Sequence, residues 1–335
     1  MDLSPHEPIS TPIPSRDDAK HAFTQLCTGL LVLTLVYQTA AGAGMFIVSF
    51  VRTLTALFVT GSDPELLMDT VTAAAADPTL LMVINDLALY GIAVPLLWLI
   101  VRRLPTAHTE EPLRLSSRWL LRCTVICVGG LYVFSVFGTY LSQAVELLGG
   151  SPTAATESLA GIPLWALFFF ICVIAPIGEE FIFRKLLFDR ALVFGELGVV
   201  VFTATAFGLF HGNLEQFFYT TALGFVLGYV TLRTRDLRYA IFLHFAANLF
   251  GGFLPSVLAF SLPLSGLYLL AMLIVCSFAA FFAITSVRHV HFAPSPCLPT
   301  QGLLRFIWGN PTGIIFFSLS CLTALIYLVT MFIVV

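Results

Sequence analysis

Two adjacent carboxylates stand at the end of an uncharged apolar stretch. Glu179 and Glu180 follow residues 165–174, which carry no charge, and Arg184 comes four residues after Glu180. A charged side chain inside a membrane span costs roughly 2.5–3.5 kcal/mol on insertion scales, so such residues are candidates for a functional site. Glu180 and Arg184 have the i, i+4 order that favours an ion pair on one helix face. Glu179 lies about 100° around the helix and is therefore the carboxylate left for chemistry.

The residues just before the glutamates predict a kink, because Pro176 removes a backbone donor and Gly178 relaxes the chain. The alternative for the whole stretch is a structural ion pair at a helix end near the membrane surface.

Three more polar side chains interrupt apolar segments. His211 ends one segment, and His244 and Asn248 lie four residues apart inside another, on one helix face. With a rise of about 1.5 Å per residue, counted from a hairpin turn near Gly195, Glu180 and His211 both lie about 22 Å from the turn. The pattern predicts that two carboxylates, two imidazoles and a carboxamide converge inside the membrane.

The overall composition is that of an integral membrane protein. Of 335 residues, 58% are hydrophobic and 10% are charged, and the mean hydropathy is +0.95. These values leave no room for a soluble domain of ordinary size. The net charge of −3 gives no sign of a nucleic-acid partner. The seven cysteines contain no C-x-x-C pair and lie mostly in apolar segments, so we interpret them as small hydrophobic residues.

Nine apolar segments approach the length of about 20 residues that a spanning helix needs. We therefore expect an all-α polytopic transmembrane helix bundle, with eight spans as the alternative if the first or last segment lies along the interface. The polar residues 1–22 are expected to form a disordered cytoplasmic tail rather than a signal peptide. The expected spans are residues 23–50, 79–101, 117–147, 162–194, 197–212, 214–233, 238–259, 264–287 and 311–335.

The basic residues predict the orientation. With the N-terminus inside and nine crossings, fifteen of the sixteen Lys and Arg lie on or near the cytoplasmic side, and only Arg52 does not. This asymmetry is what the positive-inside rule requires, so we expect N-in, C-out. A short surface helix is expected in the outer loop 61–78, and Asp86 is expected to snorkel or to contact water. The outer loops, which contain no Lys or Arg, are about 61–78, 148–161, 212–215 and 258–264.

The three motifs, in this order and each on its own apolar segment, resemble the CPBP (Abi) family, which includes CAAX prenyl proteases and bacteriocin-processing or immunity proteins. The resemblance covers residues 160–255 and divides the chain into the tail 1–22, N-terminal helices 23–158, a catalytic core 159–258 and C-terminal helices 259–335. The matching residues are Glu179, Glu180 and Arg184 (Glu-Glu-x-x-x-Arg), Phe207 and His211 (Phe-x-x-x-His), and His244 and Asn248 (His-x-x-x-Asn).

The resemblance implies an intramembrane endopeptidase that hydrolyses a peptide bond with a glutamate-activated water. Glu179 would be the general base, and His211 would help to orient or deprotonate the water. His244 and Asn248 would donate to the developing oxyanion, while Glu180 with Arg184 would hold the helix in register. We expect a prenylated peptide, a leader peptide or a membrane-protein segment as substrate, membrane lipids as partners, no nucleic acid and no cofactor. The expected location is the plasma (inner) membrane of a prokaryote.

Three alternatives remain open from the residues alone. Glu179, His211 and His244 form a ligand set that zinc accepts with water in the fourth position, although there is no His-Glu-x-x-His helix. The second alternative is a non-catalytic membrane partner or immunity-type protein of the same fold. The third alternative is a transporter, since intramembrane acids and histidines also form proton relays. The sequence shows no repeated halves of the kind that many transporters have.

Overall fold

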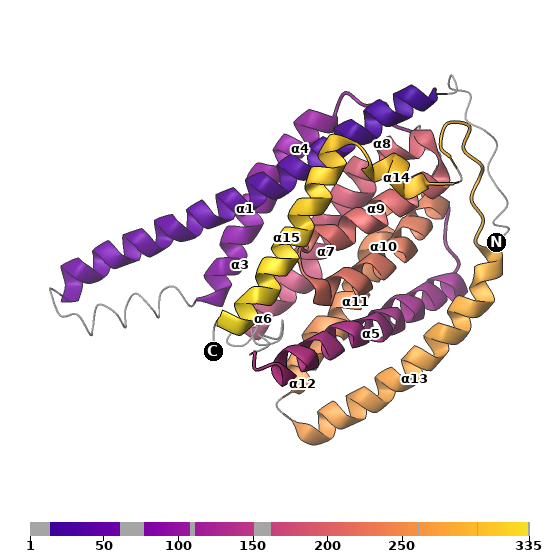
Figure 1. The fold of residues 1–335 in the computed structure, drawn as a ribbon. Helices are drawn as coiled ribbons and strands as arrows, with labels where there is room; N and C mark the ends of the chain where they lie inside the picture. Colours follow the sequence, from indigo (N-terminus) through magenta and orange to yellow (C-terminus); the bar gives the residue numbers. More distant parts are fainter. Residues whose placement is uncertain are drawn as a thin grey trace.

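The computed structural model describes residues 14–60, 77–107, 111–150, 162–259, 261–299 and 301–333. In these ranges the regular elements are all helices, and no strand occurs. The chain is an all-α, polytopic membrane bundle (Figure 1). The expected surface helix in loop 61–78 lies almost wholly outside the described residues.

Helices occur at each of the nine expected segments. Seven are long and apolar enough to cross a membrane, whereas α9 is shorter and α10 is not among the seven. The bounds are α1 (Arg16–Thr60); α3 (Pro78–Asp86), η1 (Leu87–Ala93) and α4 (Val94–Val101); α5 (Ser117–Leu147); α6 (Leu164–Leu167), η2 (Phe168–Ile174), α7 (Ala175–Glu180), η3 (Phe181–Leu187), α8 (Phe188–Ala191) and η4 (Leu192–Phe194); α9 (Glu196–Phe210); α10 (Leu214–Thr234); α11 (Leu237–Asn248), η5 (Leu249–Phe253) and α12 (Leu254–Leu258); α13 (Leu262–Ser286) and η6 (Val287–His289); α14 (Leu303–Trp308); and α15 (Pro311–Ile333).

The first helix begins earlier than expected. Ser15 and Asp18 form a capping box, in which Asp18 N–H donates to Ser15 Oγ at 3.1 Å and Ser15 N–H donates to Asp18 Oδ2 at 2.9 Å. This reciprocal cap starts α1 at Arg16, so the last part of the expected disordered tail is helical. Residues 1–13 of that tail lie outside the described residues.

The same helix is also longer than a membrane crossing requires. Its 45 residues span about 67 Å at 1.5 Å per residue, against about 30 Å of hydrocarbon. Figure 1 shows its C-terminal part running out beyond the other helices. There Phe46 and Phe58 are 71% and 89% exposed, so this part packs against little of the bundle.

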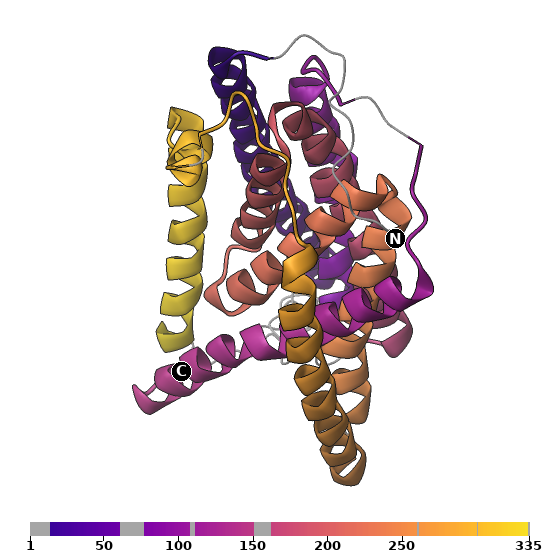
Figure 2. The same cartoon turned by 90° about the vertical axis from the view of Figure 1, so that its right-hand side faces the viewer.

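Close helix contacts at glycines hold the bundle together. Gly224 of α10 leaves no room for a Cβ, which would lie 2.9 Å from the Cα of Ala204 on α9. Gly129 of α5 lies against Ala279 of α13 in the same way. Small residues let membrane helices approach closely. Figures 1 and 2 show α7, α9, α10 and α11 in the interior of this packing, between α1, α5 and α15.

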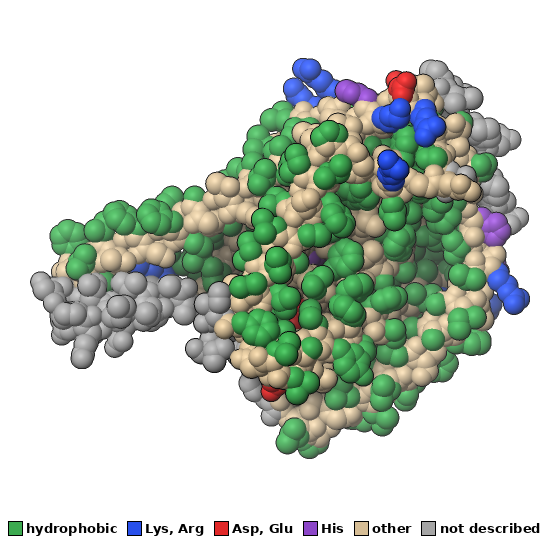
Figure 3. All heavy atoms as spheres, viewed as in Figure 1, with side chains coloured by type: hydrophobic (Ala, Val, Ile, Leu, Met, Phe, Trp, Pro, Cys, Tyr) green, Lys and Arg blue, Asp and Glu red, His purple; other side chains and the backbone are tan. Residues whose placement is uncertain are grey.

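Basic side chains gather at one end of the bundle, along the upper and right-hand edge in Figure 3, while green apolar side chains cover most of the remaining surface. Polar contacts join the helix ends there: Arg190 Nε donates to the Val101 carbonyl at 2.6 Å, and Arg233 lies 3.2 Å from Glu196. We call this the basic end and define it by Arg102, Arg118, Arg190, Arg238 and Arg288. It is the end that the expected orientation places in the cytoplasm.

Candidate active site

The helix that carries the two glutamates changes its hydrogen-bond register just before them. In the π-helix η2 the bonds run from residue i to i−5, and Ala175 N–H donates to the carbonyl of Phe170. Pro176 comes next in this register and has no N–H to give to the Ile171 carbonyl. The Asn248 side chain replaces it, because Nδ2 donates to the Ile171 carbonyl oxygen at 2.8 Å. Asn248 therefore anchors α11 to the turn that precedes the glutamates.

The predicted ion pair is present and fully buried. Arg184 Nη1 donates to Glu180 Oε1 at 3.3 Å, Nε lies 3.1 Å from Oε2, and both side chains are 0% exposed. Nη2 of the same arginine donates to the Gly224 carbonyl at 3.2 Å, on α10. Glu180 also accepts a hydrogen bond from His244 Nδ1 at 2.8 Å. Glu180 therefore joins α7 to α11, and Arg184 joins the same helical run to α10.

The hydrogen bond to Glu180 determines how His244 can act. Since Nδ1–H donates to the carboxylate, neutral His244 carries a lone pair on Nε2. This Nε2 faces Glu179, with 3.8 Å to Oε2, which exceeds hydrogen-bond length. The Glu179 side chain is 16% exposed and makes no hydrogen bond within the described residues. The two neighbouring glutamates thus differ: Glu180 is fully buried and hydrogen-bonded, whereas Glu179 is partly exposed and makes no hydrogen bond among the described residues.

His211 reaches the same region from the end of α9. Its Nδ1 donates to the Phe207 carbonyl at 2.8 Å, which leaves Nε2 for a ligand. The Phe207 ring lies between the two imidazoles, 5.0 Å from His211 and 5.5 Å from His244, and Arg184 lies 4.8 Å over it. The structure thus brings both histidines, both glutamates and Asn248 to one region. Among the described residues, no hydrogen bond links His211 directly to either glutamate.

Helices outside the predicted core also reach the site. The Tyr90 ring and hydroxyl on η1 lie against Gly178, where any Cβ would collide with them. Gly178 is thus required for close approach, one residue before Glu179. One oxygen of Asp86 is buried without a hydrogen-bond partner among the described residues, while the residue as a whole is only half-buried. Besides Arg184 and His244, the side chains of Tyr37, Asp86, Tyr90 and Tyr219 lie within electrostatic range of Glu179.

Sequence reasoning assigned none of these tyrosines to the site. Tyr37 and Tyr90 lie on helices that carry no motif, and Tyr219 lies on α10 between two motif helices. The only available signal was Asp86, a carboxylate at the membrane-embedded start of its segment.

The zinc alternative requires Glu179, His211 and His244 to lie together as ligands. Among the described residues, no three His, Cys, Asp or Glu side chains are grouped so that they could hold a metal ion. Of the proposed ligands, His244 Nε2 lies 3.8 Å from Glu179 Oε2, whereas the Phe207 ring lies between His211 and His244.

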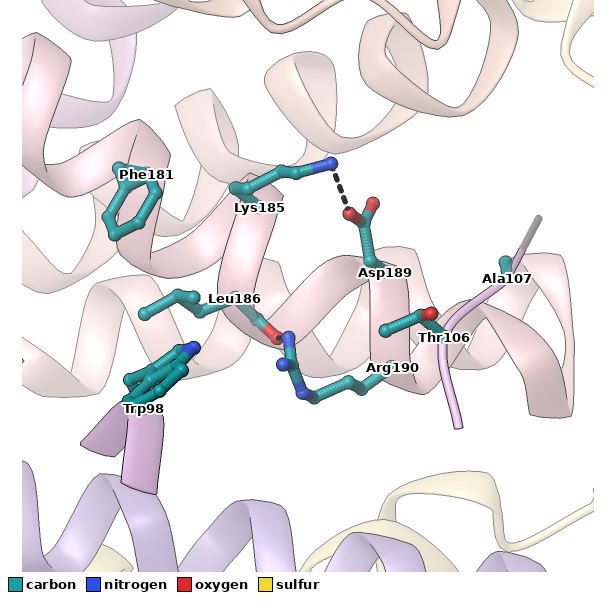
Figure 4. A pocket seen from close by; sticks show the side chains of 8 residues that line it. All are labelled: Trp98, Thr106, Ala107, Phe181, Lys185, Leu186, Asp189 and Arg190. Carbon is teal, nitrogen blue, oxygen red and sulfur yellow. Dashed lines mark hydrogen bonds and ion pairs between the residues drawn. The ribbon is translucent and has the colours of Figure 1, made fainter. Parts of the chain in front are cut away.

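A pocket of about 570 Å³ lies between α4, η3 and α8 (Figure 4). It is lined by Trp98 and by Phe181, which directly follows Glu180, and extends to Lys185 and Asp189. These last two side chains form an ion pair of 2.7 Å, drawn as a dashed line. The pocket reaches the basic end at Arg190, and its lining includes none of the predicted site residues.

We expect Asn248→Ala to lower stability. The change leaves the part-buried Ile171 carbonyl without this donor, and an unsatisfied acceptor costs at most about 1–3 kcal/mol when fully buried. The measurement is thermal or denaturant unfolding of the purified protein in detergent. Asn248→Gln, which keeps the amide but moves it by one methylene, should recover only part of the loss. An Asn248→Ala protein as stable as the wild type would contradict the anchoring role.

Comparison with known proteins gives two matches. Residues 161–250 match the family model described as "Type II CAAX prenyl endopeptidase Rce1-like". The candidate membrane peptidase YdiL of Bacillus subtilis (strain 168) is 24% identical over 162 residues, which are 45% of this chain and 63% of that protein. The match thus spans less than two thirds of the relative. No solved structure matches the chain. The matched family segment contains Glu179, Glu180, Arg184, His211, His244 and Asn248.

Proposed function

We propose that this chain, whose residues 161–250 belong to the CPBP (CAAX protease) family, is an intramembrane endopeptidase in which Glu179 activates water. One observation carries the proposal. Both Arg184 and His244 bind the Glu180 carboxylate. The neighbouring Glu179 is partly exposed, makes no hydrogen bond among the described residues and lies 3.8 Å from His244 Nε2. A carboxylate in that state can accept a proton, which is the requirement for a general base.

The proton transfers follow from this division of roles. Glu179 takes a proton from the water as its oxygen attacks the peptide carbonyl carbon, and the carbonyl oxygen becomes an oxyanion. The protonated Glu179 then gives the proton to the leaving nitrogen as the C–N bond breaks, which yields a carboxylic acid and an amine. His211 holds the water through Nε2, since its Nδ1 is bonded to Phe207. Glu180 orients His244, whose Nε2 donates to the oxyanion when the ring is protonated.

A cleavage screen tests the proposed activity. Purified protein in detergent is incubated with three probes: a peptide prenylated near its C-terminus, a leader peptide and a membrane-protein segment. We expect one class to be cut at a single peptide bond, and we expect cleavage to survive exhaustive chelation. The glutamate mechanism would be overturned if the protein contained one zinc ion per chain, if chelation removed both the zinc and the activity, and if added zinc restored the activity.

The orientation in the membrane is a separate prediction. Reporter fusions at Pro105, Asp236 and Pro294 should report the cytoplasm, because these positions adjoin helix ends at the basic end. Fusions at Asp63 and Ser151 and at the C-terminus should report the outside. A cytoplasmic C-terminus would contradict nine crossings. We further propose the plasma membrane of a prokaryote as the location, with membrane lipids around the bundle.

A further inference from the structure

The donors expected to stabilise an oxyanion are already partly engaged. Asn248 gives one N–H to the Ile171 carbonyl, and His244 gives Nδ1–H to Glu180. Neutral His244 then has no N–H left to donate, and only its protonated form can serve a developing negative charge. An enzyme that stabilises an oxyanion in an apolar membrane needs a donor that is in place before the reaction begins.

Tyr90 provides such a donor in the right place. Its ring and hydroxyl lie against the backbone of Gly178, and the adjacent Glu179 is within electrostatic range. Its hydroxyl makes no hydrogen bond within the described residues. A tyrosine hydroxyl is protonated at neutral pH, with an ordinary pKa of about 10, and it is therefore a donor.

The position of Tyr90 is held by both helices. Gly178 has no side chain to push the ring away, and Tyr90 itself is packed against the buried core. Asp86, four residues earlier on the same helical run, is also within electrostatic range of Glu179. Residues four apart share a helix face, so this face of the helix is turned toward the site.

We propose that Tyr90 is a catalytic residue of this chain: its hydroxyl donates a hydrogen bond to the carbonyl oxygen of the bound peptide as that oxygen gains negative charge. The role rests on the proposed peptidase activity and deepens it. It also means that a helix outside the family-matched segment 161–250 completes the site. No covalent bond to tyrosine is formed, and its proton stays on the phenol throughout.

The test is Tyr90→Phe, which removes the hydroxyl and keeps the ring against Gly178. We expect kcat to fall by on the order of 10²-fold, the usual cost of one oxyanion donor, with KM and the unfolding temperature unchanged. The matched control is Tyr229→Phe, which removes a hydroxyl bonded to the His289 carbonyl at 3.0 Å near the basic end. The control should keep wild-type kcat.

Each outcome decides the matter. A Tyr90→Phe protein with wild-type kcat overturns the role of Tyr90 while the cleaving wild type still supports the peptidase. A loss confined to KM or to stability also overturns it, because the ring would then serve packing or substrate docking. A wild-type protein that cleaves none of the three probes removes the proposed function, and the role of Tyr90 falls with it.

Discussion

Glu179→Gln is expected to abolish most cleavage while the protein folds, inserts and binds peptide like the wild type. The amide has the size and hydrogen-bonding reach of the acid but cannot take a proton from water. Loss of a general base lowers turnover by about 10²–10⁴-fold. Because the side chain makes no hydrogen bond within the described residues, the exchange removes little that stabilises the fold. The measurement is single-turnover cleavage of the best probe, together with peptide binding and thermal unfolding.

A matched control for this change is Glu146→Gln, which removes an exposed carboxylate near the end of α5. It should cleave at the wild-type rate. A Glu179→Gln protein that retained full cleavage would contradict the proposed base. One that cleaved nothing yet retained full biological function in cells would favour a non-catalytic role for the fold.

Arg184→Ala is expected to cause the largest loss of stability. The substitution leaves the Glu180 carboxylate, which is 0% exposed, buried without its counter-ion. Breaking a buried pair by removing one partner costs about 3–5 kcal/mol. The guanidinium also bonds to the Gly224 carbonyl on α10, so a contact between two helices is lost as well. Activity should fall together with the free energy of unfolding, because the same carboxylate orients His244.

The next residue along the helix offers the control. Lys185 pairs with Asp189 at 2.7 Å, but the lysine side chain is 48% exposed. Exposed pairs contribute about 0–1 kcal/mol, so Lys185→Ala should change stability little. The double variant Glu180→Ala/Arg184→Ala should be less destabilised than the sum of the two single changes. Wild-type unfolding of Arg184→Ala in detergent would show that the buried pair does not hold the structure.

The helices were predictable because the membrane imposes a simple rule on them. Every apolar segment of sufficient length becomes a helix, since backbone groups in lipid must bond within the segment. The helix ends were less predictable. The start of α1 depends on the cap formed by Ser15 and Asp18, a polar signal that apolar counting ignores.

The site was predictable where its geometry is local to one helix. The i, i+4 spacing predicted the pair of Glu180 and Arg184, and His244 was among the polar residues expected to converge with them. The partner of Asn248 was not predictable, because it depends on the register of η2. In an α-helix Pro176 would leave the carbonyl of residue 172 unpaired, and in the π-helix it leaves that of Ile171.

Tyr90 could not have been found from spacing at all. Nothing in the sequence relates residue 90 to residue 178, and only the packing of the two helices brings them together. Gly178 was interpreted as a source of chain flexibility near a kink. The structure shows instead that it makes space for an aromatic ring.

The buried ion pair also has a consequence for biosynthesis. Glu180 and Arg184 belong to one helix and can neutralise each other as soon as that helix forms, so the segment does not enter the bilayer with two unpaired charges. His244 lies 64 residues downstream of Glu180. At roughly 5–20 residues per second, translation needs about 3–13 s to reach it. Once the glutamates have been synthesised, the segment that carries them is therefore ready for insertion, but the proposed active site is incomplete until α11 has been synthesised.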